Sequence, residues 1–69
     1  MPLTMARTGE AKTIVRVTGR DEVRNHLAKL GFIEGEQVTV VSEQGGDMIL
    51  NIKGSRIALG RTMANRIMV

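Results

Sequence analysis

The sequence has 69 residues, 42% of them hydrophobic, and its 10 Lys and Arg against 7 Asp and Glu give a net charge of +3. So short a chain makes one small domain over residues 1–69, and its core must be aliphatic because Phe32 is the one aromatic residue. The absence of cysteine excludes disulfides, thiol catalysis and thiolate metal sites. No apolar run approaches the roughly 20 residues that cross a bilayer, and no apolar core of a secretory signal is present, so we expect a cytoplasmic protein.

The charges are unevenly distributed along the chain. Residues 1–29 carry six basic and three acidic groups, residues 30–52 carry four acidic groups only, and residues 53–69 carry four basic groups only. The basic balance makes a small nucleic-acid-binding barrel one alternative function. Proteins that hold single strands usually stack bases on aromatic rings, however, and the chain has no Tyr or Trp. We therefore expect no nucleic-acid partner.

The first predicted strand covers residues 11–17. The segment AKTIVRV is rich in β-branched residues and lies between turns that contain Gly9 and Gly19. Its apolar residues do not alternate strictly, which predicts either a bulge or burial on both faces.

A helix is predicted over residues 22–30, with Asp21 as its N-terminal cap. Val23, Leu27 and Leu30 recur at the spacing of one helical face. This stripe should face the core, while the charged residues between its members should face solvent.

The helix should end at an abrupt joint. Gly31 follows the last apolar residue of the helix, where a left-handed backbone conformation is open mainly to glycine. Phe32 or Ile33 can then fold back over the helix end, and Gly35 lets the chain reverse into the next strand. Structural roles are therefore predicted for Leu30, Gly31, Phe32, Gly35, Gly54 and Gly60.

The second half of the chain is predicted to be a meander of short strands. A hairpin loop is expected over residues 43–47, and one helical turn over residues 61–65, after Gly60 has broken the preceding strand. The strands are predicted over residues 36–42, 48–54, 56–59 and 66–69. The residues expected to face inward are Val38, Val40, Met48, Leu50, Ile52, Ile67 and Val69.

These elements favour a mainly β fold, a small partly open barrel of the SH3 kind with about five strands. One α-helix lies between the first two strands, and a short helical turn precedes the last. Closure of the barrel removes most exposed sheet edges, which a chain too small for a sandwich needs.

No catalytic or metal-binding site can be assembled from the sequence. His26 is the one histidine, and with Glu22 four residues earlier it makes only a two-ligand set, whereas metal sites need three or four ligands. Glu43 and Asp47 are expected to be solvated loop residues, and no Ser or Thr stands beside a base. We therefore expect a non-enzyme without a cofactor or a bound metal.

Two long stretches, LAKLGFIEGEQVTVV and GGDMILNIKGSRIALGRTMANRIMV, stand in an order and at a spacing that resemble the FeoA family of small ferrous iron transport proteins. With Gly9 and the segment 14–19, the resemblance covers nearly the whole chain. It implies an SH3-like barrel and a cytosolic accessory role beside an FeoB-type membrane transporter, whose N-terminal region is G-protein-like. Association with the membrane would then be indirect, through the transporter. Transition-metal binding is a family-level expectation, for which this sequence supplies no ligand set.

The functional hypothesis is a module that docks on this transporter and regulates it. Two contact surfaces are predicted, one on the exposed face of the helix at Arg24, Asn25 and Lys29, the other beside the hairpin at Met48 and Ile49. Ile49 is out of phase with the inward-facing residues of its strand. Direct delivery of Fe(II) as a carrier is a further alternative, and the sequence leaves a homo-oligomer open.

Overall fold

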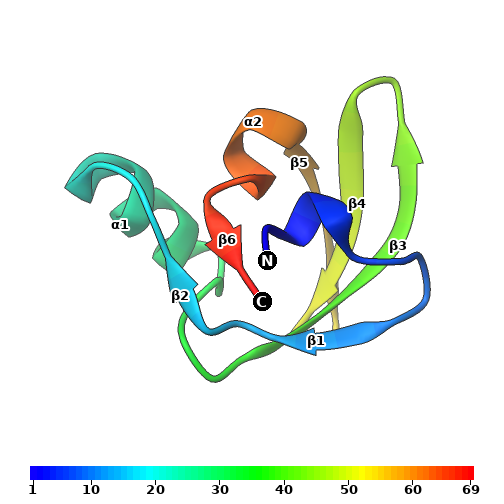
Figure 1. Ribbon diagram of the computed structural model, residues 1–69, viewed down its shortest axis with the longest axis horizontal. Coiled ribbons are helices and arrows are strands. Elements are labelled where there is room, and N and C mark those ends of the chain that lie inside the picture. The colour runs from blue at the N-terminus through cyan, green and yellow to red at the C-terminus, as the bar shows by residue number, and fades with distance from the viewer.

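The computed structural model describes residues 1–69 and contains six strands in two sheets, two α-helices and one 3-10 turn (Figure 1). The elements, in chain order, are η1 (Leu3–Met5), β1 (Ala11–Thr13), β2 (Arg16–Val17), α1 (Asp21–Lys29), β3 (Gln37–Gln44), β4 (Asp47–Ile52), β5 (Ser55–Gly60), α2 (Arg61–Ala64) and β6 (Ile67–Met68). The mainly β prediction is confirmed, with α1 before the meander and the short α2 before the last strand.

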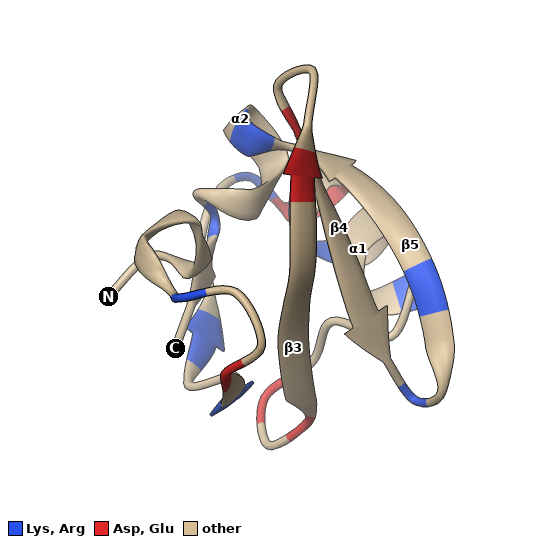
Figure 2. Cartoon of the chain, turned by 90° about the vertical axis from the view of Figure 1, so that its right-hand side faces the viewer, with Lys and Arg blue, Asp and Glu red and all other residues tan.

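The larger sheet has the order β1-β3-β4-β5, and every neighbouring pair is antiparallel. Figure 2 shows β3, β4 and β5 side by side. Alternate residues of β3 and β4 point into the core, as their sequences predicted: Val38, Val40, Met48, Leu50 and Ile52 are all buried. Period-two burial therefore sets which face of this sheet is apolar.

A turn of only two residues joins β3 to β4. Gln44 pairs with Asp47, so Gly45 and Gly46 make the turn alone, with φ of 58° and 87°. The predicted loop over residues 43–47 is therefore too long. Two consecutive positive φ angles form a two-residue hairpin turn, so the strands extend up to Gln44 and from Asp47. Acidic residues lie at both ends of β3, in this hairpin and in the loop before the strand (Figure 2).

The strand predicted over residues 11–17 is divided between the two sheets. β1 pairs with β3, whereas β2 pairs with β6 in the smaller sheet. Between them, the Ile14 N–H donates to the Glu36 carbonyl (2.9 Å) and the Val15 N–H donates to the Met68 carbonyl (2.8 Å). The irregular alternation thus marks the point where the chain passes from one sheet to the other, a larger break than the expected bulge. The structure therefore has six strands, whereas about five were predicted.

Twelve apolar residues form the core, and no polar or charged residue is buried with them. Both sheets, both helices, the joint after α1 and the N-terminal turn contribute to it. Its members are Leu3, Ile14, Leu27, Phe32, Val38, Val40, Met48, Leu50, Ile52, Leu59, Ala64 and Ile67.

The N-terminal segment closes the barrel on the side of β6. Leu3, in η1, is fully buried, and Pro2 forms an isolated bridge to Met68. The sequence reading assigned no element to this segment, because one apolar residue in a single 3-10 turn leaves no periodic pattern.

The helix α1 starts one residue earlier than predicted. Arg20 occupies the N-cap position and no side chain caps the helix, so the prediction that Asp21 is the cap is wrong. Asp21 is instead the first helical residue. Its carboxylate interacts favourably with the positive end of the helix dipole and pairs with Arg24 one turn further along the helix. Neither α1 nor α2 is long and apolar enough to cross a membrane.

The end of α1 is a Schellman turn. Gly31 takes the left-handed conformation (φ 104°), its N–H donates to the Ala28 carbonyl (3.0 Å), and the Phe32 N–H donates to the Leu27 carbonyl (2.9 Å). Phe32 and Leu27, which this turn brings together, are both buried. Phe32 therefore seals the helix against the core, as one of the two predicted arrangements required, while Ile33 stays exposed.

Replacing Phe32 with Ala should lower the free energy of unfolding by about 3 kcal/mol or more, because the side chain is 1% exposed and its loss leaves a cavity under the helix end. A domain of this size has little stability to spare, so the variant should be largely unfolded in thermal melts followed by circular dichroism. Phe32→Leu, which keeps most of the apolar volume, is the control and should melt between the two. A Phe32→Ala melt unchanged from the parent would contradict the assigned core role.

Candidate functional site

The most distinct concavity lies beside the joint, between α1, β2 and the residues that follow Phe32. Its volume is about 250 Å³. It is lined by Val17, Arg24, Asn25, Ala28, Phe32, Ile33 and Glu34, and we call it the α1 cleft. Four of these seven residues are hydrophobic, so the cleft combines an apolar floor with a polar margin.

The local sequence explains how these side chains meet. Arg24, Asn25 and Ala28 recur three and four residues apart and so share one face of α1. Gly31 then turns the chain back, which buries Phe32 and leaves Ile33 40% exposed at the mouth of the cleft. The Glu36 N–H donates to the Ile33 carbonyl (3.2 Å), which fixes the loop after the joint.

The charges at the margin are only partly satisfied within the chain. The Arg24 guanidinium pairs with the Asp21 carboxylate on the same helix. Lys29, exposed near the C-terminal end of α1, takes part in none of the four ion pairs. Of the lining residues, Glu34 also takes part in no ion pair. Lys29 is therefore the cation of α1 that remains free to meet an acidic side chain of another molecule, next to a margin of mixed charge.

The structure separates the two predicted contact surfaces. Arg24 and Asn25 line the cleft, and Lys29 lies on the same helix outside it. In Figure 1, α1 lies at one end of the molecule and the β3–β4 hairpin at the other. The helix residues and the hairpin residues thus cannot form one continuous surface.

The hairpin-side prediction fails at Met48. This side chain is 0% exposed and belongs to the core, so it cannot touch a partner, and the prediction that it is a contact residue is wrong. Ile49 does face away from the core as predicted, but it is half-buried, flanked in the sheet by Ser42 and Ala58. Out-of-phase position in a central strand therefore indicates the outer face, without making the side chain prominent.

Four lining residues were not predicted from the sequence: Val17, Ala28, Ile33 and Glu34. Val17 comes from a strand distant in sequence, so no local pattern connects it to α1. Ile33 was named only as an alternative to Phe32 for closing the helix. A usable signal was that pair itself, because a Schellman turn buries one apolar residue and turns the next one outward.

The chemistry available here is that of contact. No three His, Cys, Asp or Glu side chains approach one another closely enough to hold a metal ion, and His26 is exposed on α1. The predictions of no enzyme, no cofactor and no metal site remain predictions.

Comparison with known proteins gives a consistent result over the whole chain. Residues 1–69 match the model of the FeoA domain. A protein named "Putative Fe(2+) transport protein A" from Methanocaldococcus jannaschii is 34% identical over 68 residues, covering 99% of this chain and 83% of that protein.

Two solved structures extend the similarity to the fold. A crystal structure described as an iron uptake regulatory protein (FeoA) superposes with a TM-score of 0.90 at 31% identity, over 99% of this chain and 90% of that one. FeoA of Stenotrophomonas maltophilia, solved with zinc and described as a prokaryotic SH3 domain protein, gives a TM-score of 0.87 at 25% identity, over 100% of this chain and 88% of its own. The predicted SH3-like barrel is thereby confirmed.

The scarcity of ligands predicts weak metal binding by the single chain. Titration with Zn(II) or Fe(II) in a calorimeter should show only the weak heats of scattered surface carboxylates, because no set of three potential ligands forms around His26. One tight stoichiometric site that His26→Ala abolishes would contradict this expectation. Sedimentation of the same samples separates a site within one chain from a site shared between two chains.

Proposed function

Because the chain belongs to the FeoA domain family, we propose that it is a non-enzymatic accessory protein of ferrous iron transport that acts in the cytoplasm by docking on an FeoB-type transporter. The family match and the Fe(2+) transport protein of Methanocaldococcus jannaschii support the iron transport role. The Stenotrophomonas maltophilia relative is described as a candidate activating factor of bacterial ferrous iron transport, which supports a regulatory effect.

The observation that carries the docking proposal is the α1 cleft. At about 250 Å³ it is smaller than the roughly 300–1,000 Å³ of typical small-molecule sites, and it suits one or two apolar side chains of a protein partner. Ile33, exposed beside the buried Phe32, adds an apolar projection at its mouth. A buried apolar contact framed by polar groups is the usual arrangement at the centre of a protein interface.

The cations of α1 fit an acidic partner surface. Charges at the rim of an interface act mainly on the association rate and its salt dependence, whereas an apolar side chain buried on binding sets the dissociation rate. We assign the first role to Lys29, with Arg24 and Asn25 beside it, and the second role to Ile33. Ile33 takes the place that the sequence gave to Ile49.

The two alternatives receive less support. Phe32, the one aromatic side chain, is buried, so no ring is available for stacking nucleobases. A carrier of Fe(II) needs a ligand set, and no group of three potential ligands comes together in the chain. Docking requires neither an exposed ring nor a metal site.

The test is binding kinetics on the purified cytosolic part of the transporter. Ile33→Asp should raise the dissociation rate constant by about tenfold or more. Burying a side chain of the size of Ile contributes roughly 1.5–3 kcal/mol, and the variant puts a charge in its place. Lys29→Glu should lower the association rate constant, with a smaller effect at high salt, where the charges of both partners are screened.

Matched controls exist on β5, which lies in the larger sheet and contributes nothing to the cleft. Ala58→Asp and Arg56→Glu introduce the same changes of charge at exposed positions and should leave both rate constants close to those of the parent. Each variant must melt like the parent. Equal effects from the α1 variants and the β5 variants, or none from either, would place the contact elsewhere, and no binding by the parent would contradict docking.

A further inference from the structure

A second exposed apolar surface lies apart from the α1 cleft, on the face formed by β6, the residues before β2 and the N-terminal turn. Met5 is 70% exposed and Val15 is 65% exposed. Met1, which is 49% exposed, and Met68, which is half-buried, adjoin them. None of these four residues lines the cleft. We call this surface the methionine face.

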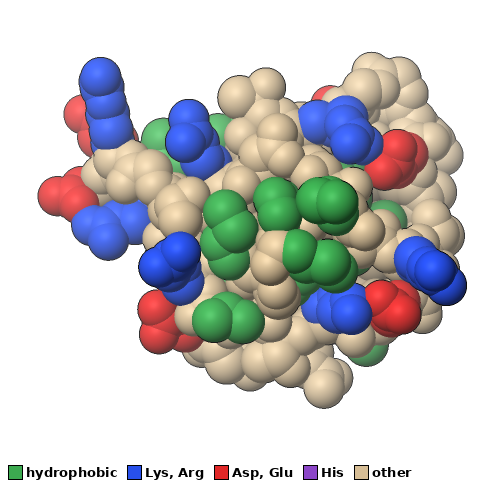
Figure 3. Space-filling model, viewed as in Figure 1, with side chains coloured by type: hydrophobic (Ala, Val, Ile, Leu, Met, Phe, Trp, Pro, Cys, Tyr) green, Lys and Arg blue, Asp and Glu red, His purple; other side chains and the backbone are tan.

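Backbone contacts hold the segments of the methionine face together. The Val15 N–H donates to the Met68 carbonyl (2.8 Å), and Pro2 bridges to Met68 from the other side. The Met5 N–H donates to the Pro2 carbonyl (3.0 Å), which ties η1 to the same edge. Figure 3 shows the result, a group of hydrophobic side chains in the middle of the face, with Lys and Arg side chains and some Asp and Glu side chains around it.

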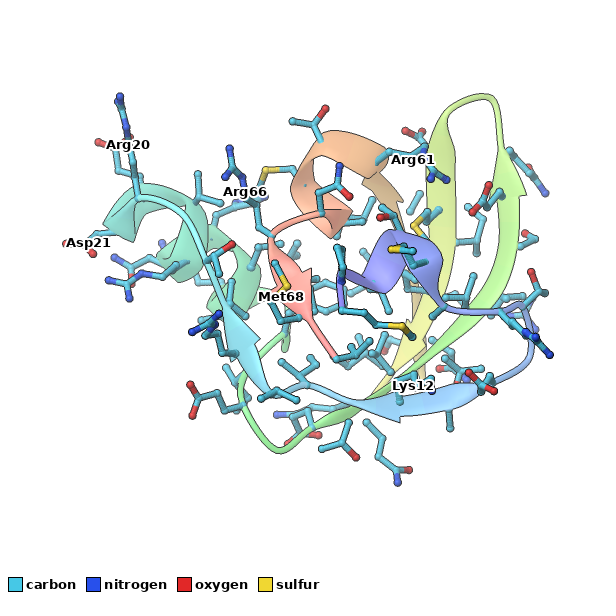
Figure 4. The ribbon with its side chains drawn as sticks, viewed as in Figure 1. Lys12, Arg20, Asp21, Arg61, Arg66 and Met68 are labelled. Atoms are coloured by element: carbon cyan, nitrogen blue, oxygen red, sulfur yellow. The ribbon has the colours of Figure 1, made fainter.

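Two arginines beside this face, Arg16 and Arg66, have no acidic partner. Arg16 pairs with Met68 across the small sheet, and Arg66 precedes the inward-facing Ile67 and so shares the outer side of β6 with Met68. None of the four ion pairs of the chain includes Arg16, Arg20 or Arg66. Figure 4 labels Arg66 and Met68 on the viewed face, whereas Arg20 lies at the end of the molecule beside α1.

Two acidic residues, Glu10 and Glu43, are paired with cations of the chain. Lys12 and Arg61, also labelled in Figure 4, pair with Glu10 (3.0 Å) and Glu43 (2.9 Å). Arg16 and Arg66, which share the side of the small sheet that carries Met68, therefore supply unpaired positive charge beside the methionine face. Guanidinium groups bind phosphate oxygens well because they offer paired donors.

From this combination we propose that the methionine face binds the surface of an anionic lipid bilayer. Exposed, flexible methionines can enter the boundary between headgroups and acyl chains, while arginines around them contact lipid phosphates. An acidic amphipathic helix of a protein would need a groove, and the one cleft of this chain lies at α1. The methionine face instead projects side chains outward, which suits a deformable surface. This inference does not depend on docking to a transporter.

The test is sedimentation of the full chain with phosphatidylcholine vesicles that contain or lack phosphatidylglycerol. The chain should bind the anionic vesicles, and this binding should weaken as the salt concentration rises. It should bind neutral vesicles only slightly. Arg16→Gln/Arg66→Gln should lower the partition coefficient roughly fivefold for each arginine, about 25-fold together. Met5→Ser should lower it by about tenfold, and because Met5 lies outside the core this variant should still fold.

The matched control is Lys53→Gln/Arg56→Gln, which also removes two positive charges. Lys53 lies in the turn between β4 and β5, and Arg56 lies near the start of β5. This control should keep at least half of the parent's partition coefficient. The proposal is overturned by absence of binding to anionic vesicles, by equal losses in control and arginine variants, or by a Met5→Ser chain that binds like the parent. It is also overturned if the chain does not bind vesicles and Met5→Ser weakens its binding to a purified protein, because the methionine face is then a protein contact.

Discussion

The left-handed turn at Gly31 is the constraint on which the rest of this small barrel depends. A side chain at this position would meet only ordinary contacts with Lys53 and Ile52, 3.7–3.9 Å away, so the requirement for glycine comes from its φ of 104° and not from lack of space. The turn stops α1, drives Phe32 into the core and leaves Ile33 outside it. The loop that follows is then tied to the switch between β1 and β2, because the Gly35 N–H donates to the Ile14 carbonyl (2.8 Å).

Patterns local to one element were sufficient to predict most of the fold. The alternation in β3 and β4, the apolar stripe of α1 and the glycine at its end each follow from the geometry of a single element. The split of residues 11–17 could not be predicted in this way, because the choice between β3 and β6 as partner depends on where distant segments lie. The same holds for Leu3, whose burial depends on β6 and α2 and not on any repeat in its own sequence.

The candidate site was only half predictable for a related reason. Arg24 and Asn25 both lie outside the apolar stripe of α1, so the helical pattern indicated that they are exposed, and both line the cleft. Val17 and Ile33 join them only after the chain has folded, one through β2 and the other through the turn at Gly31. Met48 shows the opposite error, because proximity to the hairpin suggested a contact residue while its phase in the strand placed it in the core.

The fold thus uses its whole interior for stability and leaves function to its surface, as a domain with a twelve-residue core must. The direct measurement of the proposed docking is an amide NMR titration of the labelled chain with the cytosolic part of an FeoB-type transporter. We predict that the largest shift changes fall on residues 24–29 and 32–34, around the α1 cleft, and that β4 and β5 stay near their free positions. Changes confined to β4 and β5, or none at saturating partner, would contradict docking through the α1 cleft.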